Sequence, residues 1–198
     1  VQKIASEHGR IIFNGDNYTE DWVKEAEKRG LPNIRNAVAA IHEMLDPLFE
    51  ETFEKHGVLT SHELHARHEI LLERYMKEIN IEALTTISMA KRQILPAVLE
   101  YTGTVAGAAV SLKGLGVNCD AHMKELERLS SLTADLQANI VTLEGAVEQA
   151  EEAETAEAYR DVVIPAMNAV RAAADKLEMI VDAAVWPLPT YAEMLFLR

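Results

Sequence analysis

The sequence contains a single cysteine, Cys119, among 198 residues. One thiol cannot form a disulfide within the chain, and this usage is typical of proteins from a reducing compartment, so we expect a cytoplasmic location. A nucleophilic thiol would need an electropositive neighbourhood. Asp120 follows Cys119 directly and His122 lies three residues on, so a Cys–His pair stays open beside the simpler interpretation of an unreactive thiol.

Turn-forming and aromatic residues are also scarce, with 9 glycines, 6 prolines and 6% aromatic residues. Few turns mean that the secondary-structure elements must be long. Alanine, leucine and glutamate, which are strong helix formers, are abundant. With 48% hydrophobic and 26% charged residues the composition is that of a globular protein, and it predicts an all-α fold built from long helices.

Positive charge is in short supply, because 19 Lys and Arg residues face 32 Asp and Glu residues and the net charge is −13. An acidic surface repels phosphate backbones and anionic lipid, so we expect no nucleic-acid partner and no membrane. No uninterrupted apolar run approaches the roughly 20 residues of a membrane span. The start, Val1 to Ile4, lacks an initiator methionine and does not resemble a signal peptide, so we expect a fragment or processed product.

Sequence motifs of catalysis and cofactor binding are absent. The chain has no GxxxxGK[ST] phosphate loop, no GxGxxG turn and no GxSxG nucleophile elbow. It also lacks the Glu-x-x-His spacing of di-iron helical bundles. We therefore predict no catalytic and no cofactor-binding residue in this chain.

One cluster of possible metal ligands remains, formed by His65, His68 and Glu69. Spacings of three and four residues place them on one helix face, where imidazole and carboxylate groups can hold a divalent metal. The cluster is not an HExxH zinc motif, because Ala66 stands four residues after His62. A solvated first helical turn is the favoured interpretation, and a metal site is the alternative.

The first part of the chain is predicted to be an irregular lead-in over residues 1–17, with a β-like run at 11–13. Helices are expected over 18–118. The first should follow Thr19 as its cap, and the second should run from an Asn33 cap to about Met44. Thr60 and Glu63 have the spacing of a capping box, which predicts a very long helix over about 61–112, bent at Pro96.

The segment 119–184 carries two stretches in which apolar residues alternate at spacings of three and four. A short charged loop at about 151–156 separates them, so they are expected to pack as an antiparallel helical hairpin with a heptad seam. The seam around Leu136 and Ile140 is interpreted as core, with an exposed partner-binding seam as the alternative. A tail over 185–198 completes what we expect to be a single helical domain spanning 1–198.

Two blocks are more specific than helix patterning requires. Residues 10–22 read RIIFNGDNYTEDW, and residues 186–191 read WPLPTY. Between them, 79–84, 89–91 and 94–98 read INIEAL, MAK and ILPAV. In this order they resemble the C-terminal region of type III glutamine synthetases, the large bacterial form. The helices around 120–184 are the least specific part of the resemblance.

The resemblance implies a parent ligase that uses ATP and magnesium or manganese to make glutamine from glutamate and ammonia. It also implies a homo-oligomer in which this chain contacts the catalytic domain and neighbouring subunits. No residue here matches the family's catalytic motifs, so this segment alone is predicted to be inactive. The tail at 186–198 either folds back on the chain's own helices, which we favour, or docks onto another domain. The alternative to the whole interpretation is a stand-alone helical protein that binds a metal or a partner.

Overall fold

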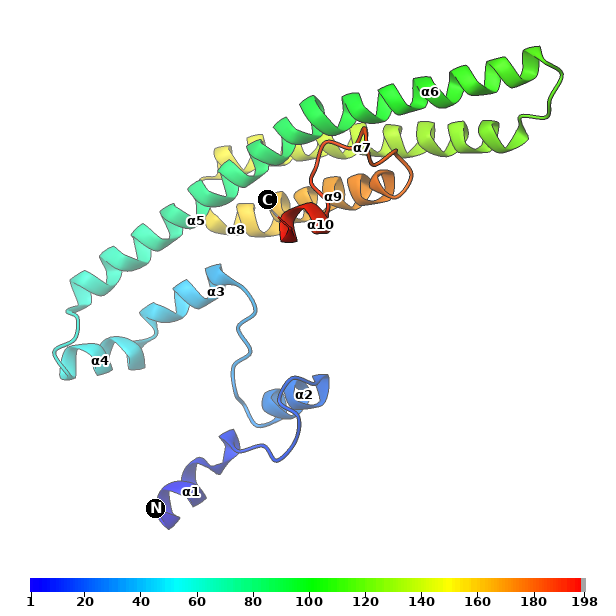
Figure 1. Cartoon of the computed structure of the whole chain (residues 1–198). Coiled ribbons are helices and arrows are strands. Elements are labelled where there is room, and N and C mark those ends of the chain that lie inside the picture. The colour runs from blue at the N-terminus through cyan, green and yellow to red at the C-terminus, as the bar shows by residue number, and fades with distance from the viewer. Residues whose placement is uncertain (197–198) are drawn as a thin grey trace. The chain divides into compact units, whose positions relative to one another are not determined.

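The computed structural model describes residues 1–196 and forms two compact units, Val1–Glu69 and Ile70–Arg198 (Figure 1). Every regular element in the described part of the chain is helical, which confirms the all-α prediction. The division into two units differs from the single domain that we expected for 1–198.

Unit 1 begins with helix α1 (Gln2–His8) and a 3₁₀ turn (Gly9–Ile11). The expectation of an irregular lead-in over 1–17 is therefore wrong for its first half. The run at 11–13 forms no strand, because a strand needs a partner and the described residues offer none. Residues 12–19 do form an irregular connection, which leads into α2 (Glu20–Lys28).

The remaining helices of unit 1 are short. They are α3 (Ala37–His42), a 3₁₀ turn (Glu43–Leu45) and α4 (Pro47–Lys55). The cap of α3 is Asn36 rather than the predicted Asn33, because the Asn36 side chain accepts a hydrogen bond from the Ala39 amide at 2.8 Å. Val38 and Leu64 are fully buried in this unit and anchor α3 and the first turns of α5.

The long predicted helix is present as α5 (Ser61–Met89), a π-turn (Ala90–Ile94) and α6 (Leu95–Gly114). The π-turn lies directly before Pro96. Proline has no amide hydrogen and its ring clashes with the carbonyl one turn earlier, so the helix widens there instead of breaking. The same arrangement recurs later, where the π-turn Tyr159–Val163 precedes Pro165.

The stretch Ser61–Gly114 is long and apolar enough to cross a membrane, with a mean hydropathy of 1.2 in its most apolar window. Only 22% of that window is buried in the structure. Length and composition alone are weak evidence, since core helices of soluble proteins share them. The expectation of no membrane partner stays a prediction.

The second half of unit 2 contains α7 (Asp120–Ala153), α8 (Ala156–Ala158) and α9 (Ile164–Glu178). Helix α7 continues through the first half of the predicted loop at 151–156 and ends with its C-cap at Glu154. Helix α9 ends at Glu178, before the predicted end at 184. The short helix α10 (Tyr191–Leu195) follows in the tail.

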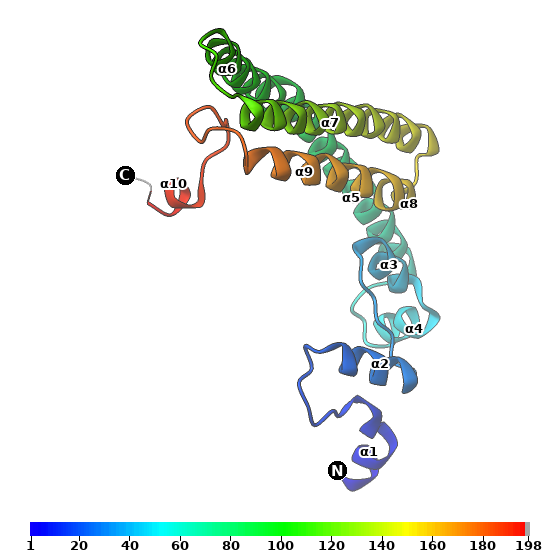
Figure 2. The same cartoon turned by 90° about the vertical axis from the view of Figure 1, so that its right-hand side faces the viewer.

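Helix α7 packs against both α6 and α9, which lie beside it in both views (Figures 1 and 2). The core of unit 2 is therefore formed by three helices rather than by the hairpin alone. Large side chains of α7 fill it, together with residues from the π-turn and α9: Leu129, Leu136, Ile140, Leu143, Val163, Val170 and Leu177.

Candidate functional site

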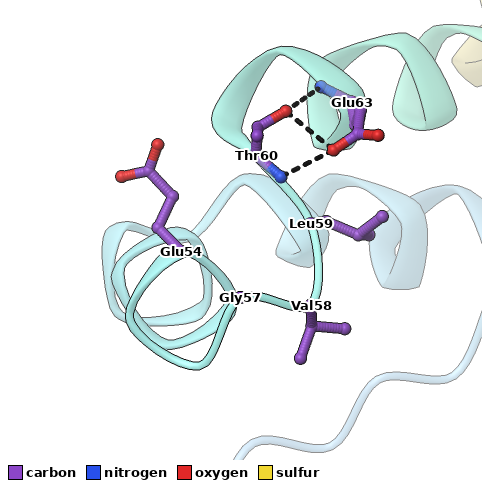
Figure 3. Close-up of a pocket in the computed structure, with 6 residues that line it drawn as sticks. All are labelled: Glu54, Gly57, Val58, Leu59, Thr60 and Glu63. Atoms are coloured by element: carbon purple, nitrogen blue, oxygen red, sulfur yellow. Dashed lines mark hydrogen bonds between the residues drawn. The ribbon is translucent and has the colours of Figure 1, made fainter.

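The first cavity lies in unit 1, between the end of α4 and the start of α5. It measures about 370 Å³ and is lined by Glu54, Gly57, Val58, Leu59, Thr60 and Glu63 (Figure 3). The Thr60 amide donates to Glu63 Oε2 at 2.9 Å, and the Glu63 amide donates to Thr60 Oγ1 at 3.3 Å. The predicted capping box is thus confirmed. Its hydrogen bonds lower the pKa of Glu63 and pair the polar groups of Thr60 and Glu63 with one another.

The predicted metal candidates do not converge. His65 Nδ1 donates to the Ser61 carbonyl at 3.0 Å, within its own helix. His68 instead meets His42 of α3, with Nε2 and Nδ1 separated by 3.1 Å. No group of three or more His, Cys, Asp or Glu residues in the described part of the chain is arranged to hold a metal. The structure brings His68 and His42 together, and His42 carried no sequence signal because it lies 26 residues away.

Burial, the neighbouring His42 and the nearby His65 lower the pKa of His68 below its ordinary value of 6.5. Between the lowered pKa and 6.5 the unfolded chain binds more protons here than the folded chain. This contribution to the free energy of unfolding is therefore present above pH 6.5 and is lost as the pH falls through that window.

We expect an NMR titration of the His68 ring in the folded chain to give a midpoint below 6.5. The same ring in the urea-unfolded chain should titrate near the ordinary value and serves as the control. A folded-state midpoint at or above that of the unfolded chain would contradict the partly buried contact between His68 and His42.

The block at 10–22 is fixed by Arg29, which lies in a stretch that shares the family resemblance but had no predicted structural role. Arg29 of α2 donates from Nη1 to the Ile12 carbonyl at 2.8 Å and from Nε to Glu25 at 2.6 Å. Its guanidinium carbon lies 5.7 Å from the centre of the Trp22 ring, which in turn packs on Phe13 at 4.7 Å. The Arg29 contact lowers the pKa of Glu25. The block is a folded structural motif and presents no catalytic arrangement.

Gly15 lies directly against the ring of Phe13 in this block. A Cβ atom at this position would lie 2.7 Å from the Phe13 ring. The glycine thus lets the chain turn closely over the aromatic side chain. This explains why a glycine stands within the block that carries the family resemblance.

The first residues of the tail at 185–198 pack against the core of unit 2. Trp186 is 9% exposed and belongs to the core, and Leu188 packs against the same core. This part folds back on the chain's own helices, as favoured from the sequence. The side chains of Tyr191, Leu195 and Phe196 are exposed, so α10 leaves an apolar surface uncovered by the described residues.

Cys119 is a free, half-buried cysteine at the N-cap of α7. No hydrogen bond joins it to His122, whose Nδ1 atom is buried without a hydrogen-bond partner among the described residues. The geometry gives the thiol no general base.

Several exposed apolar side chains follow the long helix of unit 2. Ile81 and Leu84 of α5 border a shallow cavity of about 560 Å³ with Thr85, Ser88, Met89 and Gln93. Leu99 and Val110 are exposed further along, on α6. Contiguous apolar patches on a protein surface mark sites that contact other proteins.

A family model described as the glutamine synthetase C-terminal domain matches residues 1–113. The chain is 34% identical over 195 residues to a glutamine synthetase of Butyrivibrio fibrisolvens, covering 96% of this chain and 28% of that protein. It is 31% identical over 208 residues to the type-3 glutamine synthetase of Dictyostelium discoideum, covering all of this chain and 28% of that protein. A glutamine synthetase of Bacteroides fragilis is 29% identical over 206 residues, with 98% and 28% covered.

Proposed function

This chain belongs to the glutamine synthetase C-terminal domain family, and from that premise we propose that it is a non-catalytic helical domain that supports the fold or assembly of a type III enzyme. The family match over 1–113 confirms the resemblance recognised in the block at 10–22 and in the segments between 79 and 98. The chain spans about 28% of the length of the relatives it matches. We propose that the catalytic residues lie in the part of the parent enzyme outside this chain.

The proposed parent makes glutamine from glutamate, ammonia and ATP. Divalent magnesium or manganese would neutralise the transferring phosphoryl group, held by carboxylates outside this chain. Support comes from the names of the relatives, which are glutamine synthetases. We further propose a cytoplasmic homo-oligomer without nucleic-acid or membrane partners.

The observation that carries the supporting role is the exposed apolar surface of α5 and α6. Ile81, Leu84, Leu99 and Val110 are all at least half exposed, although each is a residue type normally buried in a core. The catalytic part of the parent, or a neighbouring subunit, would remove this surface from water. Each buried methylene group contributes about 0.8 kcal/mol, so a modest contact area already stabilises docking.

We expect the 198-residue chain alone to form no glutamine from glutamate, ammonia, ATP and magnesium, because it presents no phosphate loop and no set of metal-binding carboxylates among the described residues. The measurement is glutamine formation, with a full-length type III enzyme as the positive control. Turnover above the protein-free blank would refute the non-catalytic role.

A further inference from the structure

Two histidines form a polar contact between α3 and the start of α5 in unit 1. His42 Nδ1 and His68 Nε2 lie 3.1 Å apart, and the ring centres are separated by 5.2 Å. Each histidine stands four positions after a fully buried aliphatic residue of its own helix, which is Val38 in α3 and Leu64 in α5. Residues four apart share a helix face, so each helix presents an apolar group and an imidazole on the same face.

The contact between the two rings depends on their protonation. A hydrogen bond between two imidazole nitrogens needs a proton on one nitrogen and a lone pair on the other. When both rings are protonated, the acceptor is lost and two positive charges stand at the observed separation of 3.1 Å, where they repel each other. The contact therefore requires that one of the two rings is neutral.

The groups around His68 favour its neutral form. His42 faces the ring from α3, and His65 and Glu69 act on it from α5. Burial and the two histidines lower the pKa of His68, while the carboxylate of Glu69 acts in the opposite direction. His42 takes part in a further interaction as well, so we assign the change in protonation to His68.

Helix α3 depends on this contact because little else holds it. It has six residues, and isolated helices shorter than about 12 residues are marginal in water. Val38 is the buried residue of α3, and His42 is its last residue. Helix α5 has 29 residues and continues into α6. Loss of the ring contact should therefore free α3 while α5 stays helical.

We propose that the His42–His68 pair is a pH-sensitive switch that holds α3 on α5 near neutral pH and releases it when His68 takes up a proton. The released state binds one more proton than the docked state. The ratio of released to docked chains should then rise by up to about tenfold for each pH unit below the ordinary pKa of 6.5. The rise ends below the lowered pKa of docked His68, where both states are protonated. This proposal goes beyond the proposed function and does not depend on it.

The test is a pH titration of the 198-residue chain by NMR, from about pH 7.5 to about pH 5, the range in which histidine changes its charge. The Cα chemical shifts of Val38 to Ile41 should move towards random-coil values with the same midpoint as the His68 ring. The shifts of α5 and of unit 2 should stay helical over the whole range.

Two substitutions of histidine by glutamine separate this switch from a general effect of pH. In His68→Gln the side-chain oxygen can still accept a hydrogen bond from His42 but takes up no proton, so α3 should stay helical at low pH. The matched control is His62→Gln, which makes the same change on the same helix at a residue that does not act on the His68 ring. This control should release α3 at the same pH as the parent chain.

Each result decides the proposal. Release of α3 that follows the His68 ring, is lost in His68→Gln and is retained in His62→Gln supports it. Shifts of α3 that do not change with pH would overturn it, as would release of equal size in His68→Gln or its loss in both variants. Joint loss of helical shifts throughout unit 1 would show acid unfolding instead of the release of one helix, and would also overturn it. Circular dichroism at neutral pH checks that each variant folds, and His42→Gln, which removes the other charge of the pair, repeats the test if His68→Gln does not.

Discussion

Replacing Leu136 by alanine is expected to lower the free energy of unfolding of unit 2 by about 3 kcal/mol. Leu136 is 0% exposed and lies in the middle of α7, where the helix packs between α6 and α9. Truncation removes buried methylene groups and leaves a cavity that the three long helices cannot close without shifting together. Unit 2 should therefore melt about 10 °C lower in a thermal scan followed by circular dichroism.

The matched control is Val141→Ala on the same helix. Val141 is exposed, so its truncation is expected to change the free energy of unfolding by less than about 0.5 kcal/mol. If both variants melt at the same temperature as the parent chain, α7 does not form the centre of the core.

Introducing charge on the exposed surface of the long helix is expected to disrupt a full-length type III glutamine synthetase that carries this domain. Leu84 and Leu99 are 50% and 54% exposed in the structure. If the rest of the parent covers them, Leu84→Asp with Leu99→Asp buries unpaired carboxylates at a contact. A penalty of about 3 kcal/mol corresponds to a loss of more than 100-fold in association. Light scattering should then detect smaller assemblies, with reduced glutamine formation.

Two comparisons make this result specific. In the isolated 198-residue chain the same double substitution should leave the melting temperature nearly unchanged, because both side chains already face water. In the full-length enzyme, Val141→Asp places a carboxylate on a different helix and should leave assembly intact. Normal assembly of the double variant would show that this surface stays exposed and would remove the main support for the proposed role.

Local features of the fold could be predicted well from the sequence. The Thr60–Glu63 capping box, the helix after Thr19 and the long helix through residue 112 are all present, because each depends on residues within a few positions of one another. Even so, the Thr19 hydroxyl donates to the Asp16 carbonyl instead of capping α2.

The predictions of local structure were wrong where the same short stretch allowed two conformations. Asn33 and Asn36 are both good caps, and Asn36 prevails because its side chain meets the Ala39 amide when Val38 is buried. The run at 11–13 had strand-like residues but no strand beside it. At Pro96, where the sequence predicted a bend, the structure adds a π-turn over Ala90–Ile94 that the sequence had not indicated.

The side-chain clusters in the structure were harder to predict than the helices, because they depend on contacts between residues far apart in the sequence. His68 was grouped with His65 and Glu69 because they share a helix face, yet its ring lies against His42 of another helix. The hydrogen bond between Asn80 and Glu151 was not predicted at all, since the two residues are separated by 71 positions and meet only because α5 and α7 cross there. Sequence spacing reports neighbours along one helix and carries no signal for such pairs.

By itself the sequence determined the helical class, the main helix starts and the family, because helix propensity, capping and recognisable blocks are properties of short stretches. Only the tertiary structure decided which apolar residues form the core. Leu84, Leu99 and Leu136 are the same residue type on similar helices, yet only Leu136 is buried. Burial depends on which helices pack against one another, and that is set by the sum of many weak contacts across the whole unit.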